Sequence, residues 1–119
     1  MAAADSAVLK AQLRLWLGED IAMGPGKAEL LEAIAEAGSI AAAGRKLHMS
    51  YRRAWLLVDT MNRCFRQPLV ASATGGQGGG GAHLTEAGRE VLGQYRALQA
   101  EVERVTEPWA QNLRRHLRD

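Results

Sequence analysis

The stretch covering residues 38–63, GSIAAAGRKLHMSYRRAWLLVDTMNR, limits the possible folds of this chain more than any other segment. Its pattern predicts two short helices separated by a break of about three residues, at His48, Met49 and Ser50. We expect Ser39 to cap the first helix and Ser50 the second, because a serine hydroxyl can accept a hydrogen bond from an unpaired first-turn amide. The first helix then turns three apolar residues inward, namely Ile40, Ala43 and Leu47.

The second of these helices separates two faces. Its apolar stripe consists of Ala54, Leu57, Val58 and Met61. The residues that point elsewhere are Tyr51, Arg52, Trp55, Asp59 and Arg63. A short helix, a tight turn and a helix whose free face begins Ser-Tyr-Arg-Arg is the plan of a DNA-reading helix-turn-helix. The same geometry also occurs in domains that never contact nucleic acid, so a protein-interaction module without direct DNA readout is the alternative.

Positive charge is concentrated on this element. Asp59 is the single acid between residues 45 and 66, against six basic residues: Arg45, Lys46, Arg52, Arg53, Arg63 and Arg66. The formal net charge of the whole chain is only +2. Such a patch raises the local affinity for phosphate and predicts salt-dependent binding to DNA.

The length of 119 residues suits one small domain with an accessory helix. Cys64 is the only cysteine, so an internal disulfide is excluded and a reducing compartment is expected. The N-terminus does not resemble a secretory signal, and no segment approaches the roughly 20 apolar residues of a membrane helix. We therefore expect a soluble, cytoplasmic protein without a membrane partner.

Alternating apolar and polar residues open the chain. The pattern over residues 9–17 has a period of two and predicts a strand with one apolar face. A turn at residues 18–20 leads into a short second strand that carries Ile21 and Met23. A two-stranded ribbon is marginal alone and should pack on helices or pair across a dimer. We expect Trp16, on the polar face, to be half-buried, and a contact with a partner is the alternative.

A helix is predicted over residues 27–37, with a left-handed cap at Gly38. Its inward residues are expected to be Leu30, Leu31, Ile34 and Ala35. Its outward carboxylates are Glu29, Glu32 and Glu36. Their spacing provides no paired-acid catalytic geometry and no other residues supply one, so we do not expect an enzyme.

A hairpin should follow the second helix of the helix-turn-helix. Residues 69–71 and 82–84 are expected to form its strands, with a glycine-rich loop between them. A hairpin at this position is the wing of a winged helix, and glycines let backbone amides approach phosphate closely. The literal GxGxxG at Gly76, Gly78 and Gly81 is not expected to bind a nucleotide, because a strand rather than a helix follows it. A merely flexible tip is the structural alternative.

The last element is a helix after Thr85, whose side chain can cap it. Spacings of 4, 3, 4 and 3 give it a coiled-coil seam made of Val91, Tyr95, Leu98, Val102 and Val105. The stripe can equally fold back on its own domain, but a modest core and the symmetry of DNA half-sites favour a homodimer. Pro108 is expected to end this helix or to begin another, and Trp109, Leu113 and Leu117 share one face beyond it.

Two segments, GSIAAAGRKLHMSYRRAW and LVASATGGQGGGGAHLTEAG, resemble the N-terminal winged-helix domain of the ModE family, molybdate-responsive regulators that are related in this domain to LysR-type proteins. The glycine run is the more distinctive of the two, and the resemblance covers most of the chain. It implies a dimeric, DNA-binding regulator of genes for molybdate uptake or molybdenum enzymes. Full-length members carry C-terminal Mop-type domains that bind the oxyanion, whereas this sequence stops shortly after Leu117. We therefore expect a single-domain form, with a ligand that enters through a separate protein or regulation by something other than molybdate as the alternatives, and we assign no metal, oxyanion or cofactor site.

The expected fold is mostly α with a small β component: a winged helix-turn-helix with an N-terminal β-ribbon over residues 1–84, and a dimerisation helix or helices over residues 85–119. The expected partner is double-stranded DNA. The expected DNA-contacting residues of the two helices are Ser39, Ser50, Tyr51, Arg52, Arg53 and Trp55, and those of the wing are Thr74, Gly75, Gly76, Gln77, Gly78 and Gly79. Arg52 or Arg53 is expected to contact guanine, because a guanidinium matches the paired acceptors of that base.

Overall fold

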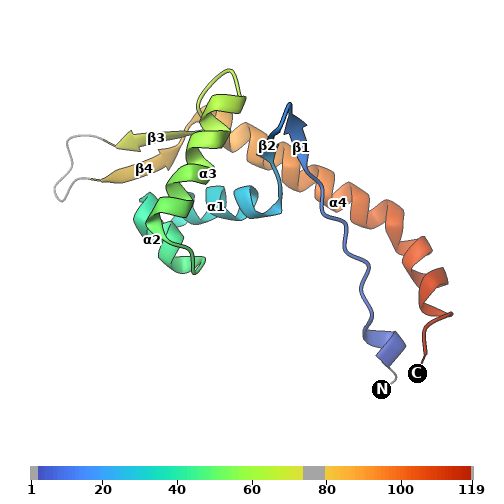
Figure 1. The fold of residues 1–119 in the computed structure, drawn as a ribbon. Helices are drawn as coiled ribbons and strands as arrows, with labels where there is room; N and C mark the ends of the chain where they lie inside the picture. Colours follow the sequence, from blue (N-terminus) through green and yellow to red (C-terminus); the bar gives the residue numbers. More distant parts are fainter. Residues whose placement is uncertain (1–2, 74–79, 119) are drawn as a thin grey trace.

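The computed structural model describes residues 3–73 and 80–118. Its elements, in chain order, are η1 (Ala3–Ser6), β1 (Leu15–Leu17), β2 (Asp20–Met23), α1 (Pro25–Ala37), α2 (Ile40–Lys46), α3 (Tyr51–Cys64), β3 (Val70–Ala73), β4 (Gly81–Leu84) and α4 (Glu86–Arg114). Strands β1 and β2 form one antiparallel hairpin, and β3 and β4 form another. Figure 1 shows a head that contains α1, α2, α3 and both hairpins, with α4 running away from it as an arm. This is the expected order of ribbon, helix-turn-helix, wing and C-terminal helix.

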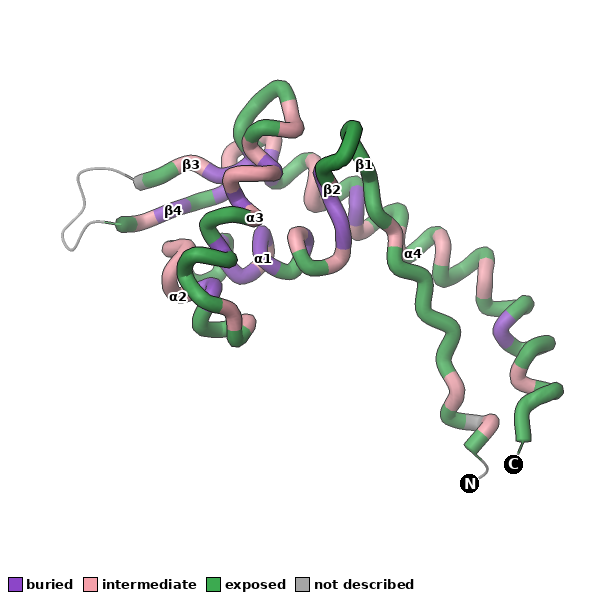
Figure 2. Tube along the Cα trace, viewed as in Figure 1, coloured by how far each residue is buried: buried purple, intermediate pink, exposed green. Residues whose placement is uncertain are grey.

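Helix α1 lies at the centre of the head. Leu30, Leu31 and Ile34 have no exposed surface, and α1 contacts α2, α3, β4 and α4. Figure 2 shows buried residues concentrated around α1 and the bases of both hairpins. The expectation that Ala35 turns inward was wrong: it is exposed, and Ala33 is buried instead. Each residue advances the helix by about 100°, which carries Ala35 past the buried face that ends at Ile34.

The helix-turn-helix forms as the sequence predicts. The Oγ of Ser39 accepts a hydrogen bond from the amide of Ala42 at 3.0 Å, and the Oγ of Ser50 accepts one from the amide of Arg53 at 3.1 Å. A Cβ at Gly44 would lie 3.3 Å from a backbone oxygen in the following turn, so glycine allows α2 and α3 to approach closely. The two predicted strands of the wing are also present, as β3 and β4, and residues 74–79 lie outside the described residues.

The N-terminal strand is much shorter than expected. Only its last three residues form β1, and residues 7–14 have no regular secondary structure. The pairing register shifts between Leu15 and Trp16, which interrupts the alternation on which the prediction relied. Trp16 is 57% exposed rather than half-buried, since β2 is the only strand beside it in the described part of the chain.

Helix α4 continues through Pro108, so the expectation that this proline ends the helix was wrong. A proline inside a helix deprives the carbonyl four residues earlier, here that of Arg104, of its amide partner. Both residues are exposed, and water can therefore solvate that carbonyl.

The first part of α4 packs on its own head. Tyr95 is buried and its hydroxyl donates a hydrogen bond to the carbonyl oxygen of Leu13 at 2.7 Å. Burial raises the pKa of the Tyr95 phenol. Val91 also packs against the core, whereas Leu98 and Val105 are about half exposed. Of the residues in the expected seam, Val91 and Tyr95 therefore pack against their own protomer, and only those from Leu98 onward are accessible to a second one.

The N-terminal segment runs beside the second part of α4, and both ends of the chain lie at the same end of the molecule (Figure 1). The Nε of Arg114 donates a hydrogen bond to the carbonyl oxygen of Ala7 at 2.8 Å. Ala110 is buried in this region. The arm is therefore a helix with an extended segment laid against it.

Gly88 of α4 lies tightly against the backbone of Leu69, at the start of the wing. A Cβ at Gly88 would lie 2.1 Å from the carbonyl oxygen of Leu69, whereas a Cβ at Gly93, on the same helix, would meet nothing within 4 Å. We expect Gly88→Ala to lower the free energy of unfolding by about 1–3 kcal/mol through overpacking. Gly93→Ala should raise it by up to about 1 kcal/mol, because alanine favours helix. Urea denaturation of both variants measures this, and equal stabilities would contradict the packing described here.

Candidate nucleic-acid interface

Helix α3 presents a polar and aromatic face to solvent because its opposite face packs against the hydrophobic core. Ala54, Val58 and Met61 are buried against the head. The residues on the other side, at and near the start of the helix, are all exposed: Ser50, Tyr51, Arg52, Arg53 and Trp55. All five are expected DNA contacts, and the structure brings them together on one accessible end of α3.

The arginines at this end of α3 are available to a partner. Among residues 3–73 and 80–118, the guanidinium groups of Arg52 and Arg53 form no ion pair and no hydrogen bond. Arg63, at the other end of the helix, differs: its Nε lies 3.0 Å from Asp59 Oδ2 and its Nη1 lies 3.8 Å from Asp20 Oδ2. The hydrogen bond that Arg63 donates to the carboxylate of Asp59 raises the pKa of Arg63. The uncompensated positive charge of α3 is therefore at its N-terminal end.

Lys27 is a further cation, whose pKa responds to the charge of Arg53. It lies in the first turn of α1 and is half-buried. Burial lowers the pKa of its ammonium group, and the positive charge of Arg53 is among the further causes that lower it. Lys27 was not among the residues expected to contact DNA, because in the sequence it lies well outside the basic stretch.

The two serines already have structural roles. The hydroxyl oxygens of Ser39 and Ser50 accept the capping hydrogen bonds of α2 and α3. A hydroxyl that accepts one hydrogen bond keeps its own proton free to donate. Ser50 is exposed and Ser39 is half-buried, so Ser50 is the better placed to donate to a ligand.

The expected wing contacts lie outside the described residues: Thr74, Gly75, Gly76, Gln77, Gly78 and Gly79. Within the described part of the wing, Ser72 and His83 are exposed, while Ala82 is buried. Alternation along β4 turns the side chain of His83 to the outside.

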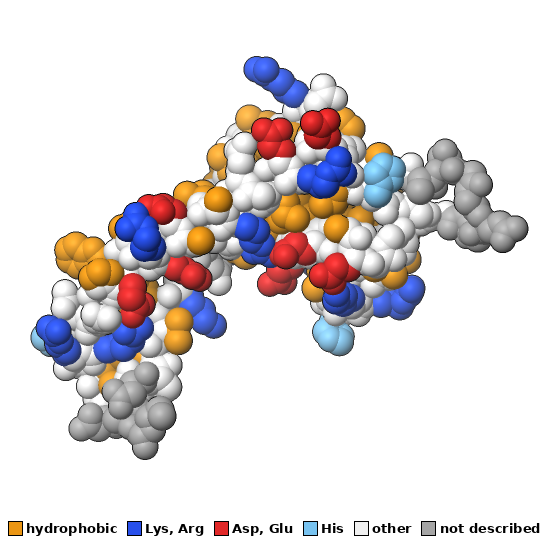
Figure 3. Space-filling model, turned by 180° about the vertical axis from the view of Figure 1, so that it is seen from behind, with side chains coloured by type: hydrophobic (Ala, Val, Ile, Leu, Met, Phe, Trp, Pro, Cys, Tyr) orange, Lys and Arg blue, Asp and Glu red, His pale blue; other side chains and the backbone are white. Residues whose placement is uncertain are grey.

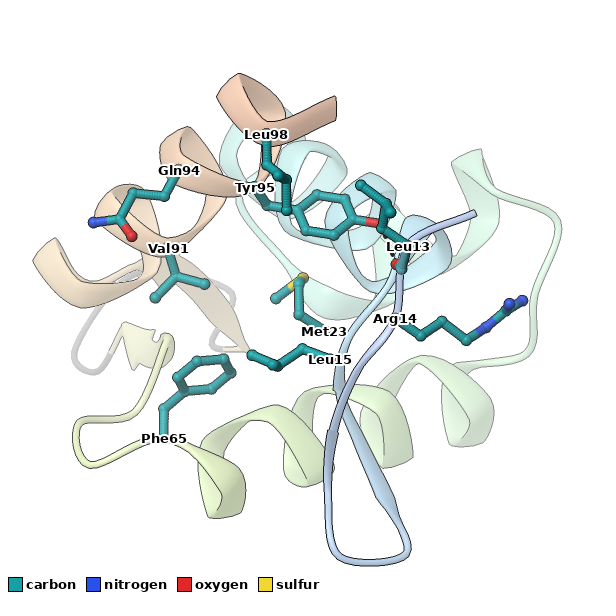
Figure 4. A pocket seen from close by; sticks show the side chains of 9 residues that line it. All are labelled: Leu13, Arg14, Leu15, Met23, Phe65, Val91, Gln94, Tyr95 and Leu98. Atoms are coloured by element: carbon teal, nitrogen blue, oxygen red, sulfur yellow. Dashed lines mark hydrogen bonds between the residues drawn. The ribbon is translucent and has the colours of Figure 1, made fainter. Parts of the chain in front are cut away.

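An apolar pocket of about 470 Å³ lies between the N-terminal ribbon, the end of α3 and α4. Its lining consists of Leu13, Arg14, Leu15, Met23, Phe65, Val91, Gln94, Tyr95 and Leu98. Figure 4 shows aliphatic and aromatic side chains around the hollow, with the head group of Arg14 pointing away from it. The pocket therefore offers apolar contact rather than catalytic groups.

Two of the three outward carboxylates of α1 form ion pairs. Glu36 pairs with Lys46, and Glu32 pairs with Arg96 of α4. In the described ranges, no group of three or more His, Cys, Asp or Glu side chains could hold a metal ion. No helix there is long and apolar enough to cross a membrane.

Comparison with known proteins identifies the domain. Residues 26–89 match the family described as "Bacterial regulatory helix-turn-helix protein, lysR family". The chain is 38% identical over 102 residues to the molybdenum transport protein ModE of Azotobacter vinelandii. The aligned region covers 84% of this chain and 38% of that protein. It is 46% identical over 77 residues to the molybdenum-pterin-binding protein MopA of Rhodobacter capsulatus, covering 65% of this chain and 29% of that protein.

A third relative is the DNA-binding transcriptional dual regulator ModE of Escherichia coli K12, 38% identical over 86 residues, covering 72% of this chain and 33% of that protein. These relatives confirm the resemblance to the ModE family. The chain spans only about a third of the length of the curated relatives that it matches.

Solved structures confirm the expected fold class. The DNA-binding domain of CbnR, solved in complex with DNA, superposes with a TM-score of 0.59 at 23% identity, covering 74% of this chain and 95% of that one. A LysR family transcriptional regulator superposes with a TM-score of 0.55 at 18% identity, covering 73% of this chain and 28% of that one.

The matched family is regulatory, which confirms the expectation of a regulator rather than an enzyme. The family match covers more than half of the chain and includes α1, α2, α3 and the wing. The chain therefore belongs to the lysR family of bacterial regulatory helix-turn-helix proteins, and its helix-turn-helix domain is ModE-like.

Proposed function

We propose that this chain is a sequence-specific DNA-binding regulator of transcription that acts as a homodimer on promoters. The observation that carries the proposal is a pair of exposed arginines at the start of α3, Arg52 and Arg53, which have no acidic partner among the described residues. The Escherichia coli relative is a DNA-binding transcriptional regulator, and the CbnR domain of similar fold was solved with DNA. Because the Azotobacter vinelandii relative is a molybdenum transport protein named ModE, we propose genes of molybdate uptake or of molybdenum enzymes as targets.

Helix α3 would enter the major groove with its N-terminal end. Basic residues supply the sequence-independent affinity by displacing counterions from phosphates. Arg52 or Arg53 would donate to O6 and N7 of a guanine, since a guanidinium matches these two acceptors. Ser50 and Tyr51 would reach flanking base edges or phosphates, and Trp55 would pack on sugar or on a thymine methyl. Ser39 would donate to a phosphate at the start of α2.

The wing would hold the neighbouring DNA backbone. Residues 74–79 are proposed to contact phosphate through backbone amides and the Thr74 hydroxyl. The exposed residues on the described strands, Ser72 and His83, lie on the way to that tip. Bacterial chromosomes lie in the cytoplasm, where we place the protein.

A homodimer would use the exposed part of α4. Beyond the packed residues Val91 and Tyr95, the helix leaves Leu98 and Val105 about half exposed, with Val102 half-buried between them. Figure 3 shows hydrophobic side chains among the charged ones along this arm. Pairing of two arms would bury these residues and hold two α3 helices in half-sites about 34 Å apart.

The readout by α3 can be tested with Arg52→Ala. On a duplex selected from a random pool, we expect a loss of about 1–3 kcal/mol in binding, because one base contact disappears. The control is Arg104→Ala on α4, which removes the same charge from an arginine that pairs with Glu101. Gel-shift titrations measure both. Equal affinities of the two variants would contradict a base contact by Arg52, and wild-type binding that is unaffected by salt would favour the protein-interaction module.

The dimer surface can be tested with Leu98→Glu. We expect sedimentation equilibrium to show a wild-type dimer and a variant monomer, because a buried carboxylate without a partner is costly. The control is Leu56→Glu on α3, where the leucine is 48% exposed compared with 50% for Leu98. A Leu98→Glu variant that remains dimeric at the wild-type concentration would move the interface to another surface.

A further inference from the structure

Asn62 lies on α3, far along the helix from the residues proposed to read DNA, and it faces the start of the wing. Its Oδ1 accepts hydrogen bonds from the amides of Leu69, at 2.8 Å, and of Val70, at 3.2 Å. Its Nδ2 donates a hydrogen bond to the carbonyl oxygen of Val70 at 3.1 Å. One side chain therefore forms hydrogen bonds with two backbone amides and one backbone carbonyl at the start of the wing. The sequence pattern gave no sign of this role, because the amide bonds a segment seven and eight residues away.

The base of the wing is also fixed at two other points. The amide of Ala82 in β4 donates to the carbonyl oxygen of Gly38, the C-cap of α1, at 2.8 Å. Thr85 donates from its amide to the carbonyl oxygen of Leu69 at 2.9 Å, and from its hydroxyl to that of Pro68 at 2.6 Å. These contacts tie the wing to α1 and to the start of α4. In the part of the chain that the structure describes, the side-chain hydrogen bonds from α3 to β3 all come from Asn62.

We propose that Asn62 is a positioning residue that fixes the direction of the wing relative to the recognition helix. This inference rests on the proposed function, because it concerns how two parts of one DNA-binding surface are held in register. Asn62 is ten residues beyond Arg52, or about 15 Å along the helix axis. It therefore acts on DNA through β3 and not by contact with a base in the groove that Arg52 would occupy.

The chemistry of the amide suits this role. A carboxylate has acceptors but no donor, and alanine has neither, whereas Asn supplies both from one planar group. Asn62 is half-buried, so water replaces its hydrogen bonds only in part. Without them β3 keeps its pairing with β4 and its place in the core but loses its side-chain hydrogen bonds from α3. The wing would then swing relative to the recognition helix, and fewer phosphates would be held at once.

The test compares Asn62→Ala and Asn62→Asp with wild type and with a matched control, Thr60→Ala. Thr60 is on the same helix, and its hydroxyl donates only within it, to the carbonyl oxygen of Leu56 at 3.0 Å. Each protein is titrated with the duplex selected by wild type at several salt concentrations, and the complexes are footprinted with hydroxyl radicals. Hydrogen exchange of the Leu69, Val70 and Ala82 amides reports the local structure.

For Asn62→Ala we expect roughly tenfold weaker binding. The slope of log affinity against log salt concentration should become shallower, by an amount that corresponds to about one to two phosphate contacts. In the hydroxyl-radical footprint, protection of the DNA backbone that flanks the major-groove contact should be lost, while protection at the major-groove contact itself should remain. The Leu69 and Val70 amides should exchange faster, with Ala82 unchanged. Asn62→Asp, which can still accept from those two amides, should keep an intermediate affinity, and Thr60→Ala should match wild type.

Two outcomes would overturn the inference while the proposed function stands. In the first, Asn62→Ala shows the same salt dependence of binding and the same footprint as wild type. In the second, all footprint protections weaken equally and the Ala82 amide exchanges faster, which would indicate general unfolding. A wild-type protein that binds the selected duplex no better than unrelated DNA would instead overturn the proposed function, and this inference with it.

Discussion

The structure depends on the burial of one short helix. Leu30, Leu31 and Ile34 of α1 are completely removed from solvent, and they belong to one buried cluster with residues of α2, α3, both strands of the wing and α4. Full burial of a leucine or isoleucine contributes about 1.5–3 kcal/mol. In a chain this small, few other residues offer comparable burial, so the position of each surrounding element is set by how it covers α1. Helices α2 and α3, strand β4 and the start of α4 meet there.

This arrangement determines what the surface can do. Helix α3 uses Ala54, Val58 and Met61 to cover the core, which leaves Tyr51, Arg52 and Arg53 on the side away from it. The acids that neutralise basic residues lie elsewhere: Asp59 and Asp20 near Arg63, Glu36 near Lys46, and Glu32 near Arg96. The exposed charge at the start of α3 is therefore a consequence of where the acidic side chains fall as well as of the number of arginines.

Local signals made most of the fold predictable from the sequence. Ser39, Ser50 and Thr85 each cap the helix that follows, since a cap depends only on a few neighbouring residues. Predictions that needed tertiary information were less accurate. The alternation over residues 9–17 indicated a long strand, but the structure lays most of that segment beside α4. The heptad spacing that includes Tyr95 indicated an open seam, but Tyr95 is buried in its own protomer.

The candidate interface was predictable to a similar extent. The basic stretch and the helix-turn-helix pattern indicated Arg52 and Arg53, because charge and periodicity are properties of the sequence. The role of Asn62 could not be identified in this way, since it comes from the start of the wing, which only the fold brings near it.

The central claim is that the start of α3 lies in the major groove. Methylation interference on the selected duplex tests this most directly, because dimethyl sulfate modifies guanine N7, which is exposed only in that groove. The account predicts two clusters of interfering guanines about one helical turn apart, one for each protomer. Undiminished binding to duplex methylated at every guanine N7, or interference confined to adenine N3 in the minor groove, would contradict it.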